Sequence, residues 1–552
     1  MYELIREPVD DWGLKQEYPL YIDTETAINE GYTDGGLYGK IRLIQLYQEH
    51  WDKVKLVDCF FLDPKYVLSG IKNYHWVGHN LAYDLNTINL ITNYFYYPKK
   101  LDDTLLLARH TWTDQKSYSL DNCLAKAGVQ AYKNLDKKEL QKSDWSGPLS
   151  EDQLRYAAED VYNLPELYHK VNPNSNFLPY ELDIEVFKPV IWLSRQGMPT
   201  NQETVQNHIQ AALIEQEKTL NSLPVNPNSP KQVTAWLDIK KSDKNTLLAM
   251  ANKGDKRAEL IVKARTLTKM LSYLKIYDRP VVYGFFSPST AASGRMSCDG
   301  GNRFDHGNLQ QVPNHLHDCF ESPEDKTFIY KDYSGIEMRT AVAFTGEEVM
   351  ADLMLSGADM HTETGKYLFN LEEITKLQRD ITKTISFGVI YGASYSRVQQ
   401  ELAAKAGVFL EFKEVKQLVD SWFKMYYGLA KWHKISKNAF HVFQYLDVET
   451  ALGRKVRCTY LPDALNIPIQ GTAGEVHKVA LLKLWKKHGE SLPLVNTIHD
   501  ANIMMTDKRD AGSWGLELDN AMVSAWEWVT KDLPIGNLPM PSGYETDNVW
   551  RF

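Results

Sequence analysis

The hydrophobic pattern of residues 1–172 changes repeatedly between two periods. Short runs rich in β-branched and aromatic residues predict strands, and longer segments with apolar residues three and four apart predict helices. The expected strands are Leu20–Ile22, Ile41–Tyr47, Val54–Val57 and Trp76–Val77, and the expected helices include Leu81–Leu90 and Gln153–Tyr168. This alternation predicts a mixed α/β domain.

The pattern changes after this domain. A polar segment with turn-forming residues, Asn172–Asn176, predicts a boundary. From about residue 180 to 280 the pattern is helical, with one break at Asn226–Pro230. Long helical patterns then surround two isolated strand signals, Thr327–Tyr330 and Leu494–Met505. The expected fold class is therefore a multidomain α/β and α+β chain, without internal repeats.

Composition narrows the class of protein. With 43% hydrophobic and 24% charged residues, the chain has the composition of an ordinary globular protein. No apolar run reaches the roughly 18 residues needed to cross a membrane, and no basic, then apolar, N-terminal signal is present. The five cysteines are scattered and form no CxxC pair, which predicts a reducing, cytoplasmic compartment and no structural zinc site.

Charge is unevenly distributed. The net charge is −9, although phosphate binding needs Lys and Arg. Between Lys231 and Arg279, however, 12 Lys and Arg stand against 5 Asp and Glu, a local excess of +7. This stretch is either a solvated helical face or a phosphate-binding surface, so composition permits nucleic-acid binding without establishing it.

Acidic residues end the first strands of the N-terminal domain. Asp23 and Glu25, as alternate residues of an extended chain, point to the same side. Such a pair is often only a surface feature, but two close like charges favour a neutralising cation. Asp84 follows the short apolar strand Trp76–Val77, and Tyr156 and Asp160, four residues apart, are neighbours on one helix face. Four acids and a phenol suit two-metal phosphodiester hydrolysis, with the metals ~4 Å apart.

In this order the five residues resemble the motifs of DEDDy 3′→5′ exonucleases. The first motif matches Asp23 and Glu25, the second Asp84, and the third Tyr156 with Asp160. The resemblance implies an RNase H-like fold for residues 1–172. It also implies that the four carboxylates bind two Mg²⁺ ions and that the tyrosine orients the attacking water.

Two further carboxylates are each expected at the end of a strand. Asp332 follows Thr327–Tyr330 and precedes a helical run, where an ordinary helix cap is the alternative. Asp500 lies near the turn within Leu494–Met505, where Asp is also a common turn residue. Together they supply the minimum of two carboxylates that can bridge two Mg²⁺ ions.

Between these two segments lies an unusual helical stripe. Arg379, Lys383, Phe387 and Tyr391 recur every four residues and therefore share one helix face. Two cations followed by two aromatics suit a triphosphate at one end and a sugar or base at the other. An ordinary amphipathic helix would instead carry Leu or Ile on such a stripe.

The three segments resemble motifs A, B and C of family A DNA polymerases of the DNA polymerase I type. The resemblance covers about residues 20–505 and includes Ser293–Ser297, Asn308–Gln310, Asp359–His361, Asn466 and Pro468–Thr472. It implies a right-hand polymerase domain at 178–552 behind the exonuclease. The thumb is expected at about 180–325, the palm at about 326–345 and 440–552, and the fingers at about 346–439.

The same resemblance implies individual roles. Asp332 and Asp500 would bind the two catalytic Mg²⁺ ions, with Mn²⁺ as an expected substitute. The incoming dNTP would contact Arg379, Lys383, Phe387, Tyr391, Glu337 and His361. The primer–template would be lined by Arg295, Asn308, Gln310, Asn466, Gln470 and His499.

Four positions depart from the family's pattern. Gly335 stands where the family usually has Gln, Ser386 where Asn is common, and Ala501 where Glu follows the motif C aspartate. Pro462 replaces an arginine. These changes leave the metal-binding carboxylates intact and affect only supporting contacts. The distance of the motifs from the bacterial consensus suggests a phage replicative enzyme.

The expected function is template-directed DNA synthesis with 3′→5′ proofreading. One alternative is an exonuclease with an inactive polymerase body, and another is a non-catalytic DNA-binding accessory subunit. The retained carboxylates and motif B cations argue against both. A monomer is expected, and candidate partners are a replicative helicase, a primase and a single-strand-binding protein.

Overall fold

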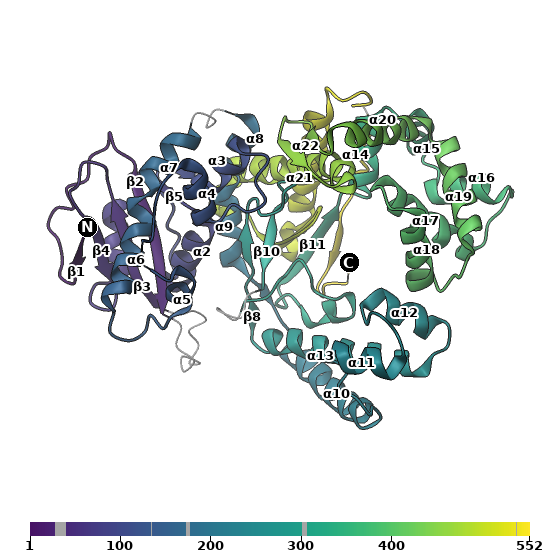
Figure 1. Cartoon of the computed structure of the whole chain (residues 1–552), viewed down its shortest axis with the longest axis horizontal. Helices are drawn as coiled ribbons and strands as arrows, with labels where there is room; N and C mark the ends of the chain where they lie inside the picture. Colours follow the sequence, from purple (N-terminus) through teal and green to yellow (C-terminus); the bar gives the residue numbers. More distant parts are fainter. Residues whose placement is uncertain (28–39, 134, 173–176, 301–305, 537, 552) are drawn as a thin grey trace.

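The computed structural model describes residues 1–27, 40–133, 135–172, 177–300, 306–536 and 538–551. The N-terminal domain lies at one end of the molecule, and the remaining chain surrounds a second sheet (Figure 1). The expected boundary segment lies, except for Asn172, outside the described residues. None of the described helices is long and apolar enough to cross a membrane.

The N-terminal domain is built on a six-stranded sheet with the order β1-β4-β3-β2-β5-β6. The strand β2 is antiparallel to β3 and parallel to β5. The strands are β1 (Tyr2–Ile5), β2 (Leu20–Ala27), β3 (Lys40–Tyr47), β4 (Val54–Asp58), β5 (His75–Gly78) and β6 (Lys100–Asp103). The helices are α1 (Pro64–Ile71), α2 (Leu81–Thr92), α3 (Thr104–Thr111), α4 (Leu120–Ala127), α5 (Lys137–Lys142), α6 (Glu151–Tyr162) and α7 (Leu164–Val171).

All four predicted strands of this domain are confirmed, as is the helix at Leu81–Leu90. The prediction of one helix over Gln153–Tyr168 is wrong, because α6 ends at Tyr162 and α7 begins at Leu164. Pro165 lies in the first turn of α7. Proline has no N–H to donate within a helix, so it favours such a first turn over a helix interior.

Two helices connect the N-terminal domain to the rest of the chain, α8 (Leu178–Glu185) and α9 (Phe187–Gln196). In α9, Phe187 and Ile191 belong to the N-terminal hydrophobic core. Val186, at its N-cap, and Val190 belong instead to the core of the larger domain. Because residues four apart share a helix face, the two faces of this connection pack into two different cores.

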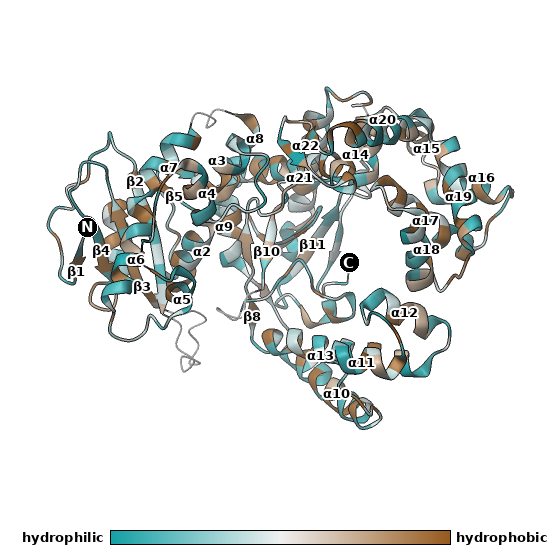
Figure 2. Ribbon diagram, viewed as in Figure 1, coloured by the Kyte–Doolittle hydropathy of each residue, from teal (hydrophilic) through white to brown (hydrophobic). Residues whose placement is uncertain are grey.

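Four helices then form a projecting helical arm: α10 (Gln202–Asn221), α11 (Pro230–Leu237), α12 (Lys244–Asn252) and α13 (Lys256–Tyr277). The predicted break is confirmed, since α11 begins at Pro230. The arm alternates between hydrophilic and hydrophobic colours, whereas the N-terminal sheet is largely hydrophobic (Figure 2). Short segments lead back from it: β8 (Val281–Val282, paired with β7, Met198–Pro199), β9 (Phe285–Ser287), β10 (Ser297–Asp299) and the 3₁₀ helix η2 (Asn314–Cys319).

The centre of the larger domain is an antiparallel sheet with the order β14-β15-β11-β16, called here the central sheet. Its strands are β11 (Lys326–Asp332), β14 (Leu494–Ile498), β15 (Ala501–Asp507) and β16 (Glu545–Asp547). Both isolated strand signals of the sequence are therefore confirmed. The associated elements are α14 (Ile336–Thr345), α21 (Leu461–His488), α22 (Ala511–Thr530) and the hairpin β12 (Leu446–Glu449) and β13 (Lys455–Cys458).

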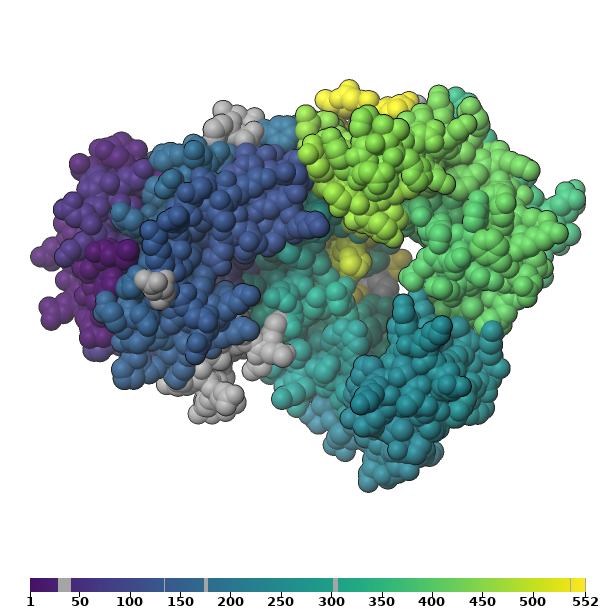
Figure 3. Space-filling view, viewed as in Figure 1, coloured from purple at the N-terminus to yellow at the C-terminus, as the bar shows by residue number. Residues whose placement is uncertain are grey.

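A second group of helices, called here the helical wing, stands opposite the arm (Figure 1). It consists of α15 (Glu348–Ser356), α16 (Met360–Phe369), α17 (Lys376–Ile390), α18 (Tyr395–Glu401), the π-helix η3 (Leu402–Ala406), α19 (Phe412–Met425) and α20 (Tyr427–Phe443). In the space-filling view the surface is hollowed between arm and wing, with the centre of the larger domain behind (Figure 3).

Candidate functional site

The N-terminal domain contains a cavity of about 930 Å³ beside β2, α2 and α6. All five predicted exonuclease residues line it: Asp23, Glu25, Asp84, Tyr156 and Asp160. The strand β2 presents its two acids on one side, as predicted, and α2 contributes Asp84 from its first turn, six residues after β5 ends. Carboxylate oxygens of Asp23, Glu25 and Asp160 all lie within 4.8 Å of one another.

Charge crowding marks this cavity as a cation site. Burial raises the pKa of Asp23 well above its usual range, and the charges of Asp84 and Asp160 raise it further. Burial also raises the pKa of Asp84 to about 7, although the Thr24 hydroxyl donates a 2.6 Å hydrogen bond to that carboxylate. Clustered carboxylate oxygens are the donors that hard divalent cations prefer, so these residues fit a divalent metal site.

Two residues outside the predicted set contact Asp160. The Tyr132 hydroxyl donates a hydrogen bond to Asp160, and Lys137 Nζ donates to the same carboxylate oxygen over 3.3 Å. Lys137 also lies over the Tyr132 ring, 4.0 Å from its centroid. Neither belongs to a recognisable motif, because Tyr132 precedes α5 and Lys137 begins it, between the second and third motifs in the sequence. Only the tertiary structure identifies them.

The second site lies at the edge of the central sheet. Asp332 ends β11 and pairs in register with Ala501, the first residue of β15, so the neighbouring Asp500 lies close to it. His499, with φ +53°, is in the left-handed conformation that tight turns use. Asp332 is not the helix cap of the alternative interpretation, because the N-cap of α14 is Gly335. Burial raises the pKa of Asp500 to about 6, and the charge of Asp332 contributes.

The helical stripe is confirmed as a geometric feature of α17. Ile381, Ile385 and Val389 are buried on the inner face, whereas Lys383 is exposed and Phe387 is half-buried. Arg379 makes a two-pronged contact with Asp359, at 3.0 Å through Nε and 2.7 Å through its terminal nitrogen. The His361 ring lies 5.8 Å from that of Phe387. Tyr391 is the C-cap of the helix.

Three of the predicted primer–template residues, Arg295, Gln310 and His499, lie near this second site. Gln310, His499 and Asp500 line a common cavity of about 310 Å³. Arg295 forms an ion pair with Glu337, so these two predicted contacts are engaged with each other. Of the remaining three, Gln470 accepts a 3.0 Å hydrogen bond from Ser293, and Asn308 accepts one from the Gln310 amide. The side-chain oxygen of Asn466 is buried and has no hydrogen-bond partner among the described residues.

The departures from the family's pattern have local explanations. Gly335 has φ +78°, a backbone conformation that would be strained in a residue with a side chain. Ser386 accepts a 3.0 Å hydrogen bond from the buried Trp422 indole and so supports the back of α17. Ala501 is buried opposite Asp332. Pro462 lies in the first turn of α21, where its missing N–H costs nothing.

Comparison with known proteins agrees with this geometry. The chain matches the sequence profile of DNA polymerase family A over residues 196–536 and that of a 3′-5′ exonuclease over residues 12–175. DNA polymerase I of Aquifex aeolicus is 28% identical, covering 94% of each chain. The thermostable DNA polymerase I of Thermus aquaticus is also 28% identical, over 49% of this chain and 34% of its own length.

A solved structure has the same overall fold. The polymerase domain of Pol1 from M. smegmatis, in complex with DNA primer-template and dNTP, superposes with a TM-score of 0.74 at 16% identity. The match covers 97% of this chain and 95% of that one. The relatives named here are bacterial, and none of them supports the expected phage origin. The profile match over more than half of the chain places this protein in DNA polymerase family A, with a 3′-5′ exonuclease domain ahead of its polymerase domain.

Proposed function

We propose that the protein extends a DNA primer on a template and removes misincorporated nucleotides from the same 3′ end. One observation carries the polymerase half of this proposal. The register of β11 against β15 brings Asp332 beside Asp500, which gives two carboxylates at one strand edge. The relative solved with primer-template and dNTP supports the choice of substrates.

In the polymerase site the chain's own residues bind and orient the substrates. Asp332 and Asp500 hold divalent ions, which we take to be Mg²⁺ with Mn²⁺ as a substitute; when bound, these stabilise the charge of the transferring phosphoryl group. Arg379 and Lys383 bind the triphosphate as charge-assisted donors. The remaining predicted nucleotide contacts, Glu337, His361, Phe387 and Tyr391, surround the sugar and base.

In the exonuclease site the carboxylates of Asp23, Glu25, Asp84 and Asp160 hold the second set of divalent ions. Tyr156 stands one helical turn before Asp160 and orients the attacking water. The cavity of about 930 Å³ that these residues line provides the space for the 3′ end of a DNA strand. The phosphodiester bond is cleaved there, and the released nucleotide leaves through the same cavity.

The proposal assigns the exonuclease to residues 1–172 and the polymerase to 178–552. The helical arm is then part of the thumb, the central sheet part of the palm, and the helical wing the fingers. The basic stretch 231–279 lies on the arm, where phosphate contacts are needed. Arg295, Asn308, Gln310, Asn466, Gln470 and His499 contact the primer–template. The chain acts as a monomer, with a helicase, a primase or a single-strand-binding protein as candidate partners.

Primer extension and degradation with a 5′-labelled primer and Mg²⁺ test both activities in one preparation. Asp332→Ala should abolish extension and leave degradation, because the two metal sites use different carboxylates. Asp23→Ala combined with Glu25→Ala should do the reverse. Loss of a ligand from a two-metal site should slow the affected reaction by about three or more orders of magnitude.

Matched controls are available on the same elements. Asp325→Ala removes an exposed acid just before β11, and Asp152→Ala removes one from the first turn of α6. Both should retain extension and degradation. Near-normal extension by Asp332→Ala would overturn the polymerase assignment and leave the exonuclease with an inactive polymerase body as the better interpretation.

A further inference from the structure

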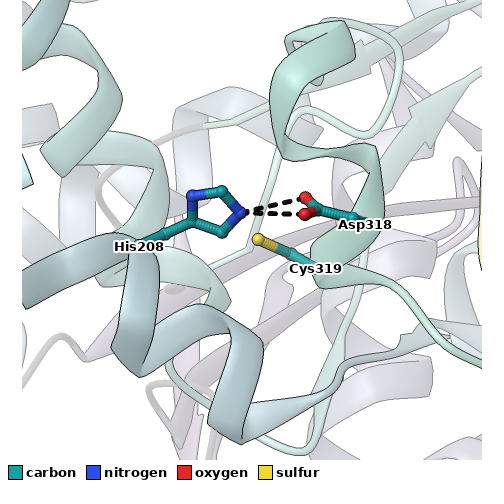
Figure 4. A group of neighbouring side chains, drawn as sticks. All are labelled: His208, Asp318 and Cys319. Atoms are coloured by element: carbon teal, nitrogen blue, oxygen red, sulfur yellow. Dashed lines mark hydrogen bonds and ion pairs between the residues drawn. The ribbon is translucent and has the colours of Figure 1, made fainter. Parts of the chain in front are cut away.

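A group of three potential metal ligands lies outside both nucleotide-processing sites. His208 comes from α10, and Asp318 and Cys319 end the 3₁₀ helix η2 (Figure 4). One donor atom from each lies within 4.8 Å of the others. The segments are more than a hundred positions apart along the chain, so no ligand spacing is visible in the sequence.

The distances are close to those of a tetrahedral metal site. The Nε2 atom of His208 lies 3.1 and 3.0 Å from the two carboxylate oxygens of Asp318. In a tetrahedral Zn²⁺ site with bonds of about 2.0–2.3 Å, neighbouring donors are about 3.3–3.8 Å apart. The Cys319 sulfur, drawn beside the imidazole in Figure 4, is within 4.8 Å of the donor atoms of the other two residues.

The backbone around the group is already fixed. The amide of Asn201, the N-cap of α10, donates a 2.8 Å hydrogen bond to the Cys319 carbonyl. The Asn201 side chain also donates to Glu321 over 2.5 Å. These contacts hold the start of α10 against the end of η2, so donors on both elements are positioned before any ion binds.

The burial of the three donors differs in a way that suits a metal ion. Cys319 is fully buried, whereas the side chains of His208 and Asp318 are 26% and 50% exposed. The sulfur therefore lies on the apolar side and the oxygen on the water side. No hydrogen bond engages the Cys319 sulfur within the described part of the chain. An ion pair between His208 and Asp318 does not explain why the Cys319 sulfur lies beside it.

We propose that His208, Asp318 and Cys319 bind one Zn²⁺ ion, with water as the fourth ligand, and thereby clamp the base of the helical arm to η2. A thiolate, an imidazole and a carboxylate together select a borderline-soft divalent cation over Mg²⁺. This differs from the expectation drawn from cysteine spacing, which detects only ligands that are close in sequence.

Cobalt substitution tests the proposal on the full chain, with excess Mg²⁺ present to occupy the carboxylate sites. Co²⁺ should bind with a stoichiometry of one at this site and produce the near-ultraviolet charge-transfer band of a sulfur ligand, which oxygen-only sites lack. Zn²⁺ should abolish that band by displacement. Cys319→Ser and His208→Gln should both lose the band, whereas Cys458→Ser, which removes another buried cysteine, should retain it.

Thermal unfolding gives an independent readout. Excess Zn²⁺ is added to protein already saturated with Mg²⁺. It should raise the Tm of the wild type by at least about 2 °C and leave the Tm of His208→Gln unchanged. His208→Gln carries the test if Cys319→Ser fails to fold, since the histidine is partly exposed. Absence of the sulfur band at saturating Co²⁺, or its survival in either ligand variant, overturns the proposal in favour of a plain His–Asp pair.

Discussion

At the scale of single residues, His477 shows how hydrogen bonds from α21 hold the turn that carries Asp500. It is buried in α21, and its Nδ1 donates a 2.9 Å hydrogen bond to the carbonyl of His499. Its Nε2 lies 2.8 Å from the Thr497 hydroxyl. Burial lowers the pKa of His477 to about 4, so the imidazole is neutral at physiological pH. The left-handed turn that carries Asp500 is therefore hydrogen-bonded to an uncharged histidine.

This arrangement predicts a loss of stability in mild acid. The unfolded state binds a proton at a pKa of about 6.5, and the folded state only near 4. Between these values the unfolded chain binds more protons, so the free energy of unfolding decreases as the pH falls. We expect His477 to account for about 2 kcal/mol of loss between pH 7 and pH 5. Urea unfolding of wild type and His477→Gln at both pH values measures it; equal pH dependence would contradict the prediction.

The proposed function implies that Phe387 contacts the sugar of the incoming nucleotide. It lies one helical turn beyond Lys383 and two beyond Arg379 on α17. A tyrosine at this position could replace the hydrogen bond that a normal 3′-hydroxyl makes, worth about 1.5–3 kcal/mol. We expect Phe387→Tyr to reduce the preference for dNTPs over dideoxynucleotides by roughly one to two orders of magnitude.

The measurement is the ratio of kcat/KM for a matched dNTP and ddNTP. It is made in the Asp23→Ala, Glu25→Ala background, so that degradation does not remove the product. If Phe387→Tyr leaves the ratio unchanged, the ring does not contact the sugar.

At the scale of elements, α16 supplies the ion-pair partner of Arg379 on α17. Asp359 is the N-cap of α16 and also holds Arg379 through two hydrogen bonds. The Arg379 hydrogen bonds lower the pKa of Asp359, so the pair is charged throughout the useful pH range. A carboxylate that accepts both prongs of a guanidinium imitates a phosphate. If Arg379 binds the triphosphate as proposed, the nucleotide displaces Asp359 from it.

Releasing that contact should favour nucleotide binding. Asp359→Asn keeps the helix cap, because Asn is as good an N-cap as Asp, but removes the charge. The pair is exposed and is worth up to about 1 kcal/mol, so we expect the KM for dNTPs to fall by up to about five-fold. Glu363→Gln, which breaks the Lys366 pair on the same helix, should leave KM unchanged. A higher KM for Asp359→Asn would show instead that Asp359 orients Arg379.

At the scale of the whole molecule, a buried ionic cluster joins the exonuclease domain to α21, a helix of the larger domain. Asp183 of α8 accepts from Arg454 at 2.8 Å and from Lys478 at 2.5 Å, and lies 3.4 Å from His110 of α3. Burial alone would raise the pKa of Asp183, but the two cations hold it well below its usual range. Four segments from both domains therefore meet at one carboxylate.

Removing this carboxylate should loosen the connection between the domains. Asp183→Asn leaves Arg454 and Lys478 buried with Glu475, 3.9 Å from Arg454, as their remaining counter-charge, and this should cost about 3–5 kcal/mol of stability. Lys486→Met breaks the exposed pair with Glu185 nearby and should cost less than about 1 kcal/mol. Thermal unfolding of both variants decides the point. A similar Tm for the two would mean that the cluster contributes nothing beyond a surface pair.

The sequence alone determined the order of the chemistry along the chain. Asp23 and Glu25 share one side of a strand, and Arg379 and Phe387 share one face of a helix, because these placements follow from local periods of 2 and 3.6 residues. The strand ends that carry Asp332 and Asp500 were also predictable, since apolar runs mark their strands.

Only the tertiary structure decided which distant residues meet. The contacts of Lys137 with Asp160, of Arg379 with Asp359, and of His208 with Asp318 each join separate segments whose spacing carries no signal. The break after Tyr162 likewise depended on where Pro165 fell relative to a helix start. Local periodicity is set by backbone geometry, whereas these pairings are set by how the helices and sheets pack, and a single sequence does not encode that packing in any short-range pattern.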